Sequence, residues 1–139
     1  MPRFDDMTVG DRIPERTETL DQARLIRYAG ASGDFNPLHW DPEFAGKVSP
    51  TGGVIAHGML NMGIVSAVVA DWAGDPGRVL RLTASFRAAC PVGAAVTYGG
   101  EVIELDAEAR TATLAVWAEL DGGSKVVDRR SSRAVVRLD

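Results

Sequence analysis

The sequence has very little cysteine, and this excludes two kinds of structural support. Cys90 is the single cysteine among 139 residues. One thiol cannot form a disulfide within the chain, and no second cysteine is present to help build a structural zinc site. We therefore predict that Cys90 is a small buried hydrophobic residue and that the fold depends on an apolar core.

The sequence also lacks long apolar runs and a marked excess of charge of either sign. Its longest apolar run, Ile64–Ala70, is far shorter than the about 20 residues that cross a bilayer. The start of the chain, Met1–Asp6, has no apolar stretch of the kind found in a signal peptide, so we expect a cytoplasmic protein with no membrane contact. The net charge of −4 gives no reason to expect nucleic-acid binding.

Only two histidines are present, and one of them follows a carboxylate closely. Asp34 stands five residues before His39, in a segment too rich in glycine, asparagine and proline to remain helical. In an ordered loop both side chains can point into one cleft, where a carboxylate and an imidazole can move a proton from one atom to another. The alternative is that Asp34 makes local hydrogen bonds while His39 lies on the surface. The sequence pattern alone leaves both interpretations open.

Two helices are predicted in the first half of what we expect to be a single domain over residues 1–139. Asp21 is a candidate N-cap for the first helix, and Gly30 is its expected end. Residues 31–53 are predicted to form an ordered loop, with at most a helical turn after the Asp-Pro pair in its middle; such long loops are often functional. The second helix, His57–Ala73, is apolar or small on almost every side, which predicts that other structure surrounds it.

The second half of the chain has the alternating pattern of strands. The predicted strands cover residues 80–87, 95–105, 111–120 and 125–138, and residues 12–19 form at most a short edge strand. This order predicts an α+β fold in which consecutive antiparallel strands curl around the long buried helix. Such a sheet has free edges, so we expect a homodimer that pairs edge strands.

The start of the apolar helix offers a site for negative charge. Unpaired N–H groups at a helix N-terminus attract anions, and Gly58 allows a ligand to approach that backbone, as an oxyanion hole requires. We expect the neighbouring His57 to be structural, with its ring bonded to a backbone carbonyl. A metal site on His39 and His57 has little support because no third histidine or cysteine stands at ligand spacing.

Two other polar residues are candidates for supporting roles. Ser66 lacks the glycines of a serine-nucleophile elbow, so we expect it to bond the backbone, or to hold Asp34 in place if it faces the loop. Asn36 is expected to form a turn, and it could also bind substrate. The basic residues of the strands are interpreted as a solvated outer face, with docking of a phosphate-bearing carrier as the alternative. They are Arg81, Arg87, Lys125, Arg129, Arg130, Arg133 and Arg137.

Three segments in a fixed order resemble a known family. Tyr28–Asp41, Ile55–Met59 and Phe86–Gly93 together resemble the MaoC-like, (R)-specific enoyl-CoA hydratase (hydratase 2) family. The match runs from the first helix to the strand after the buried helix. Within that family Tyr28–Asp41 and Ala56–Leu60 look most similar to the catalytic β-subunits of the mycobacterial (3R)-hydroxyacyl-acyl carrier protein dehydratases.

The resemblance implies a hot-dog fold and the reversible syn addition of water to a trans-2-enoyl thioester of coenzyme A or acyl carrier protein, without a cofactor. It implies that Asp34 and His39 are the catalytic dyad and that the backbone N–H of Gly58 binds the thioester oxygen. Ser66 falls where some members have a serine that hydrogen-bonds the catalytic aspartate. Some relatives are heterodimers, so pairing with a non-catalytic hot-dog subunit is an alternative to the homodimer.

Two other functions stay open on the sequence. A hot-dog thioesterase would need a carboxylate on or beside the central helix, and Asp71, near the far end, is the one acidic residue in that helix. A non-catalytic subunit that only binds the acyl chain or its carrier would not need the dyad, whereas this chain has Asp34, His39 and Gly58.

Overall fold

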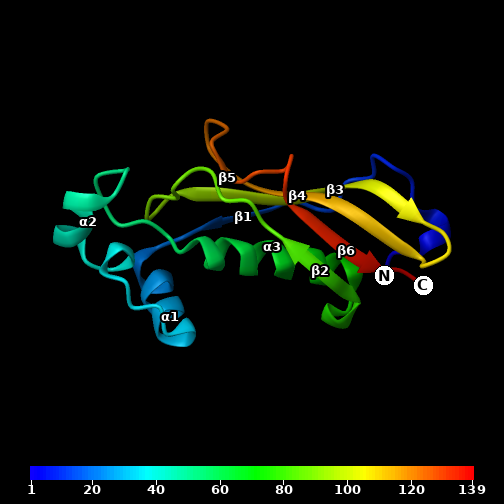
Figure 1. Ribbon diagram of the computed structural model, residues 1–139, viewed down its shortest axis with the longest axis horizontal. Coiled ribbons are helices and arrows are strands. Elements are labelled where there is room, and N and C mark those ends of the chain that lie inside the picture. The colour runs from blue at the N-terminus through cyan, green and yellow to red at the C-terminus, as the bar shows by residue number, and fades with distance from the viewer.

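The computed structural model describes residues 1–139 and shows an antiparallel sheet with one long helix packed along it (Figure 1). The helices are α1 (Gln22–Ser32), α2 (Pro42–Val48) and α3 (Gly58–Ala73), with the short 3-10 helices η1 (Phe4–Asp6), η2 (Pro37–His39) and η3 (Pro76–Arg78). The strands are β1 (Arg16–Thr19), β2 (Val79–Thr83), β3 (Ala95–Asp106), β4 (Thr111–Leu120), β5 (Lys125–Val127) and β6 (Arg133–Arg137). The predicted α+β class is confirmed.

The long hairpin of β3 and β4 forms the centre of the sheet. The strand order is β1-β3-β4-β6-β2, and β5 pairs with β4 beside this path. All pairings are antiparallel. The short edge strand expected within residues 12–19 is present as β1, which pairs with β3 alone, and β2 forms the other edge.

A glycine in the central strand β3 makes room for a tryptophan. A Cβ atom on Gly99 would lie 2.6 Å from the indole of Trp117, its partner across the β3–β4 ladder. Glycine in a strand interior normally weakens a sheet, but here it allows the indole to lie across the neighbouring strand. The guanidinium of Arg129 then covers that indole at 4.5 Å from the ring centroid.

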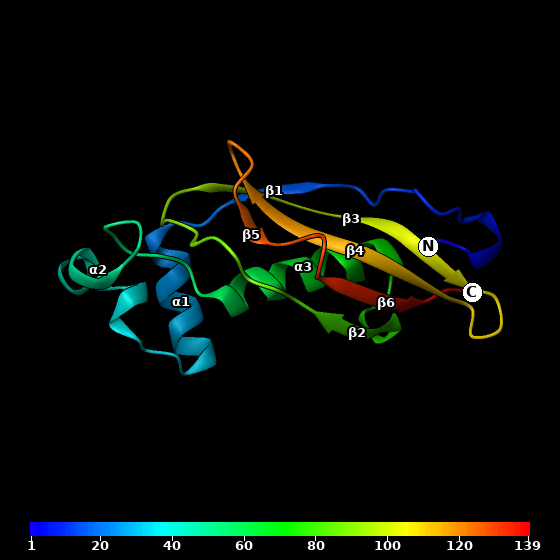
Figure 2. The ribbon, with the colours of Figure 1, turned by 45° about the horizontal axis from the view of Figure 1, so that its top comes forward.

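The sheet covers α3 on one side only, as Figure 2 shows. Six apolar residues and one amide of α3 are buried: Leu60, Asn61, Ile64, Val65, Val68, Val69 and Ala73. On the opposite side Met59, Gly63 and Ala67 are exposed. The expectation that other structure surrounds the whole helix is therefore wrong for a single chain. No helix is long and apolar enough to cross a membrane.

The two helical segments that precede α3 are both longer than predicted. Asp21 does cap α1, where its carboxylate accepts from the N–H of Arg24 at 2.8 Å. The helix continues past Gly30 to Ser32 and is capped by Gly33, whose φ of 75° is the left-handed conformation that favours glycine. The helical turn expected in the loop is a full helix, α2, because the side chain of Asp41 caps two of its N–H groups.

Two predicted strands are shorter than expected. The strand over residues 80–87 ends at Thr83, after which Phe86 makes one isolated bridge to Val127. The last strand, over residues 125–138, is broken into β5 and β6. The carboxylate of Asp128 accepts from the N–H of Arg130 at 3.0 Å, and this local bond forms a turn where the alternation predicted a continuous strand.

Candidate active site

The loop that carries Asp34 and His39 lies with α1 and α2 at one end of the molecule, beside the first turn of α3 (Figure 1). It is shaped by short-range hydrogen bonds. The N–H of Asp34 donates to Ser32 Oγ at 3.2 Å, and the N–H of Asn36 donates to Asp34 Oδ1 at 3.2 Å. The side chain of Asn36 in turn accepts from the N–H of Leu38 at 3.0 Å, so Asn36 caps η2 and is a turn former, as predicted.

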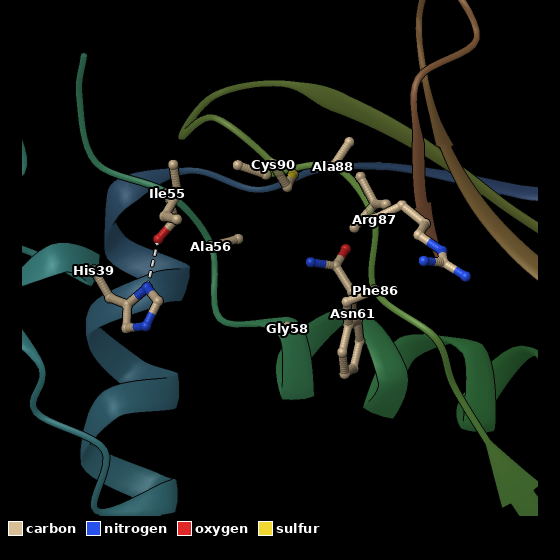
Figure 3. A pocket seen from close by; sticks show the side chains of 11 residues that line it. His39, Ile55, Ala56, Gly58, Asn61, Phe86, Arg87, Ala88 and Cys90 are labelled. Carbon is tan, nitrogen blue, oxygen red and sulfur yellow. Dashed lines mark hydrogen bonds between the residues drawn. The ribbon is translucent and has the colours of Figure 1, made fainter. Parts of the chain in front are cut away.

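His39 is fixed by a backbone carbonyl in the segment that leads into α3. Its Nδ1 lies 2.7 Å from the carbonyl oxygen of Ile55 (Figure 3). Because a carbonyl can only accept, Nδ1 carries the hydrogen of this bond, and Nε2 is the ring nitrogen left free to exchange a proton. His39 as a whole is 9% exposed, which excludes the alternative that it is a surface residue.

His57 lies beneath the loop and holds it against α3. Its ring stacks on that of His39 with 3.8 Å between centroids, and its Nε2 donates to the carbonyl of Asp34 at 3.1 Å. The ring of Tyr28 meets it edge-on at 4.8 Å. Burial lowers the pKa of His57, so the ring is held neutral. The expected bond from His57 to a backbone carbonyl is therefore present.

Asp34 brings its carboxylate to the two imidazoles from the solvent side. Its side chain is 52% exposed, and Oδ2 lies 3.9 Å from Nε2 of His57. One ligand atom from each of Asp34, His39 and His57 lies within 4.8 Å of the others. This spacing leaves the carboxylate and the His39 ring close enough to share one water molecule or one substrate carbon between them.

A pocket of about 250 Å³ opens between the first turn of α3 and the chain that follows β2 (Figure 3). Its lining residues are His39, Ile55, Ala56, Gly58, Asn61, Phe86, Arg87, Ala88, Ala89, Cys90 and Val126. The N–H of Gly58 is in the first turn and has no acceptor within the helix. The Phe86 ring lies close to Gly58, so that a Cβ atom added there would be 3.4 Å from it. The pocket therefore joins His39 to an unpaired helix N–H.

Two buried residues were not identified from the sequence: the amide Asn61, which lines this pocket, and the phenol Tyr98, which bonds it. Asn61 is 1% exposed, and its Oδ1 accepts from the hydroxyl of Tyr98 at 2.8 Å. Its Nδ2 donates to the carbonyl of His57 at 3.3 Å. The sequence does contain a signal for Asn61: it is a polar amide three residues after Gly58, on the same face of a helix that is otherwise apolar there.

Cys90 also lines the pocket, and it is buried as predicted. Burial raises the pKa of its thiol to about 11. The group therefore stays a neutral thiol near pH 7 and is a poor nucleophile.

Ser66 and Asp71 lie away from the pocket. Ser66 is eight residues beyond Gly58, about 12 Å along the helix, and lines a different hollow that it shares with Gly63 and Asp71. Ser66 does not bond Asp34 within one chain, because the helical register turns it toward the uncovered side of α3. The expectation that Ser66 holds Asp34 in place is therefore wrong for the single chain. Asp71 pairs with Arg16 at 2.9 Å. It therefore does not supply the carboxylate near Gly58 that a thioesterase would need.

Most of the predicted basic face is occupied by ion pairs. Lys125 bonds Glu119 at 2.6 Å, and Arg129 bonds Glu101 at 3.0 Å. Arg87 is the one member of the set that lines the pocket, where it lies 3.6 Å from a carboxylate oxygen of Asp128.

The three side chains around the loop could each offer a metal ligand, but their geometry favours another use. His39 Nδ1 and His57 Nε2 are both taken up by backbone carbonyls. The stacked rings direct their remaining lone pairs in nearly parallel planes, 24° apart, rather than toward one point. The absence of a metal and of a cofactor stays a prediction.

Comparison with known proteins agrees with this geometry. The family model described as "MaoC like domain" matches residues 6–119. The chain is 36% identical over 113 residues to a 3-hydroxybutyryl-CoA dehydratase of Methylorubrum extorquens, covering 81% of this chain and 71% of that protein. It is 33% identical over 117 residues to an (R)-specific enoyl-CoA hydratase of Aeromonas caviae, covering 84% of each. A solved MaoC-like dehydratase superposes with a TM-score of 0.91 at 38% identity, over 99% of this chain and 42% of the other.

A long helix on an antiparallel sheet, with an acid–imidazole pair beside the start of that helix, defines a hot-dog protein equipped for proton transfer. The chain belongs to the MaoC-like family. The predicted family and fold are thereby confirmed. The finer resemblance to the mycobacterial β-subunits stays a prediction.

Proposed function

We propose that this protein is a hydro-lyase that hydrates trans-2-enoyl thioesters to (3R)-3-hydroxyacyl thioesters, and catalyses the reverse dehydration. One observation carries the proposal: Asp34 and His39 meet beside a pocket whose wall includes the free N–H of Gly58. The relatives named above are a hydratase and a dehydratase of coenzyme A thioesters, which supports the same reaction and carrier.

We propose a task for each group. The thioester oxygen accepts from the N–H of Gly58 and takes up negative charge as Cα becomes enolate-like, which the helix dipole also favours. Asp34 and Nε2 of His39 then bracket Cα, Cβ and one water molecule. One of them removes the proton of the attacking water while the other delivers a proton to Cα, and in dehydration they exchange tasks. Because the two groups are coupled, the division of protons belongs to the pair.

The direct test offers the purified protein enoyl-CoA thioesters of short, medium and long chain together with a free-thiol reagent. Hydration removes the absorbance of the conjugated enoyl group and releases no thiol. Thiol release would indicate a thioesterase, and binding without either change would indicate a non-catalytic subunit. Asp34→Asn is the control that separates this site from a contaminating enzyme.

We also propose that the chain acts as a homodimer that uses the uncovered side of α3 together with the free sheet edges. Met59, Gly63 and Ala67 form an exposed apolar and small stripe on α3, and β1 and β2 each have one unpaired edge. A second copy with α3 antiparallel to the first would bring Ser66 toward the partner's dyad loop, which recovers a supporting role for this serine. Light scattering should give the mass of two chains. The mass of one chain would contradict the proposal, and a requirement for a different hot-dog subunit would replace it.

We propose that the carrier leaves the pocket past Arg87, whose side chain is 62% exposed. A thioester whose Cα and Cβ face the dyad directs its sulfur to the other end of the pocket, where Arg87 lies. An exposed guanidinium there suits the phosphates of coenzyme A or of the phosphopantetheine of acyl carrier protein. A cytoplasmic location stays a prediction.

A further inference from the structure

The buried Tyr98–Asn61 pair reaches the peptide unit that is assigned to the thioester oxygen. Asn61 Nδ2 donates to the carbonyl of His57, and that carbonyl belongs to the same peptide unit as the N–H of Gly58. Tyr98 donates to the other end of the amide. The bonds therefore run in one sense, from the Tyr98 hydroxyl through the Asn61 amide and the His57–Gly58 peptide to the pocket. We call this chain of bonds the Tyr98 relay.

The direction of the relay is fixed by its surroundings. The His57 carbonyl can only accept, so the atom of Asn61 that faces it must be the NH₂ group. The amide oxygen then faces Tyr98, whose hydroxyl must be the donor. Burial raises the pKa of Tyr98, so the phenol stays protonated at neutral pH. Both residues are almost fully buried, at 1% exposure for Asn61 and 0% for Tyr98.

We propose that Tyr98 and Asn61 are positioning residues that align and polarise the oxyanion peptide. A hydrogen bond to a peptide oxygen makes the N–H of the same peptide a stronger donor, because successive bonds in a chain polarise one another. The effect is largest when the thioester oxygen carries negative charge, so it stabilises the transition state more than the bound substrate. This inference rests on the proposed function, since it assigns the Gly58 N–H to a thioester oxygen.

The test compares Tyr98→Phe, Asn61→Leu and the double variant in hydration of an enoyl-CoA. Tyr98→Phe should lower kcat about 3- to 10-fold, and Asn61→Leu about 10- to 30-fold, each with KM within about twofold of wild type. Because Tyr98 acts through Asn61, the double variant should be no slower than Asn61→Leu. Independent structural roles would make the losses multiply instead, and that result would overturn the relay.

A second readout follows polarisation directly. An enoyl thioester with an electron-donating aromatic group absorbs at longer wavelength when its carbonyl is polarised, and binding to the wild-type protein should shift the band to the red. Tyr98→Phe and Asn61→Leu should reduce that shift. A full red shift and wild-type kcat in Tyr98→Phe would also overturn the relay.

The matched control is Thr97→Val, in the same strand. Neighbouring residues of a strand point to opposite faces, and the Thr97 hydroxyl bonds that of Thr17 at 2.8 Å, outside the pocket. This variant also loses one hydroxyl, but it should keep both kcat and the spectral shift. If the wild-type protein itself neither hydrates enoyl thioesters nor shifts the band, the proposed function fails. Wild-type activity with an unchanged Tyr98→Phe variant contradicts the relay alone.

Discussion

The two parts of α3 differ sharply in what surrounds them. The first turn, from His57 to Asn61, lies under the dyad loop and Phe86 and is connected to Tyr98 by a buried hydrogen bond. The middle of the same helix presents Gly63 and Ala67 to solvent. One helix therefore offers an unpaired N–H in a polar, enclosed setting at its start and an uncovered apolar stripe further along.

This difference shows how one apolar segment can serve two purposes. At the first turn, the loop and two buried polar residues arrange the peptide that would face a developing charge. Along the stripe, the small residues Gly63 and Ala67 leave room for close approach by another helix, and Ser66 lies in the same hollow. Changes at the first turn should therefore alter the chemistry, and changes on the stripe should alter assembly.

The largest effect is expected at the dyad, which the first turn supports. Asp34→Asn and His39→Gln should each lower kcat by on the order of 10²–10⁴-fold, because each removes a proton donor and acceptor without changing the size of the side chain much. Circular dichroism and thermal unfolding should show a folded protein in both cases. Turnover close to wild type in both variants would contradict the assignment of these residues.

A smaller effect is expected from a methyl group at the helix start. In Gly58→Ala the Cβ would sit 3.4 Å from the Phe86 ring and narrow the approach to the N–H. We expect kcat/KM to fall about 10- to 100-fold, which is less than complete loss of an oxyanion donor would cost, because the N–H remains and only the approach to it is obstructed. Gly30→Ala is the matched control, because a Cβ there meets nothing within 4 Å and should leave kinetics unchanged. Equal kinetics in the two alanine variants would remove the oxyanion role.

The role of the stripe in assembly can be tested with a charged residue placed away from the first turn. Ala67→Arg places a long cation in the middle of the uncovered face of α3, and light scattering should show a shift from two chains toward one. Ala109→Arg, on the exposed turn between β3 and β4, is the matched control and should leave the mass unchanged. A stable pair of chains in Ala67→Arg would show that the stripe is not the interface.

Much of this arrangement could be predicted from the sequence, because the patterns involved are local. Asp21 as a cap, the alternation of β3 and β4, and the apolar length of α3 depend on neighbours in the chain. The turn at Asp128 also uses local bonds, but the apolar alternation on both sides concealed it. Which sides of α3 are covered by other structure could not be predicted from the sequence, because periodicity shows that a face is apolar and does not show what covers it.

The candidate site also has a part that could be predicted from local sequence and a part that depends on residues far apart in the chain. The segment around Asp34 and His39 could be singled out because its composition is unusual over a short stretch. The partners that fix it, such as the carbonyl of Ile55 and the ring of His57, are 16 and 23 residues away from the atoms they bond. Tyr98 is farther still from Asn61, at 37 residues, and nothing local in β3 indicates that its hydroxyl reaches the helix.

The smallest predicted effect concerns stability at the first turn. Burial lowers the pKa of His57 from 6.5, so below that pH the unfolded chain takes up a proton that the folded chain does not. The free energy of unfolding should therefore fall as pH decreases from about 6.5, with a contribution from His57 of at most about 1.4 kcal/mol per pH unit. Urea unfolding between pH 8 and pH 5 should show this extra slope in the wild type and not in His57→Gln. Parallel pH profiles would mean that His57 titrates normally.

The central claim is that Asp34 and His39 act from one side of an enoyl thioester held by the first turn of α3. The most direct measurement is the hydration of a trans-2-enoyl-CoA in D₂O, with the configuration of the product read by NMR and by a stereospecific dehydrogenase. We expect a (3R)-3-hydroxyacyl product with one deuterium at Cα, added on the same face as the hydroxyl. A (3S) product, anti addition, or free coenzyme A with an unsaturated acid would contradict it.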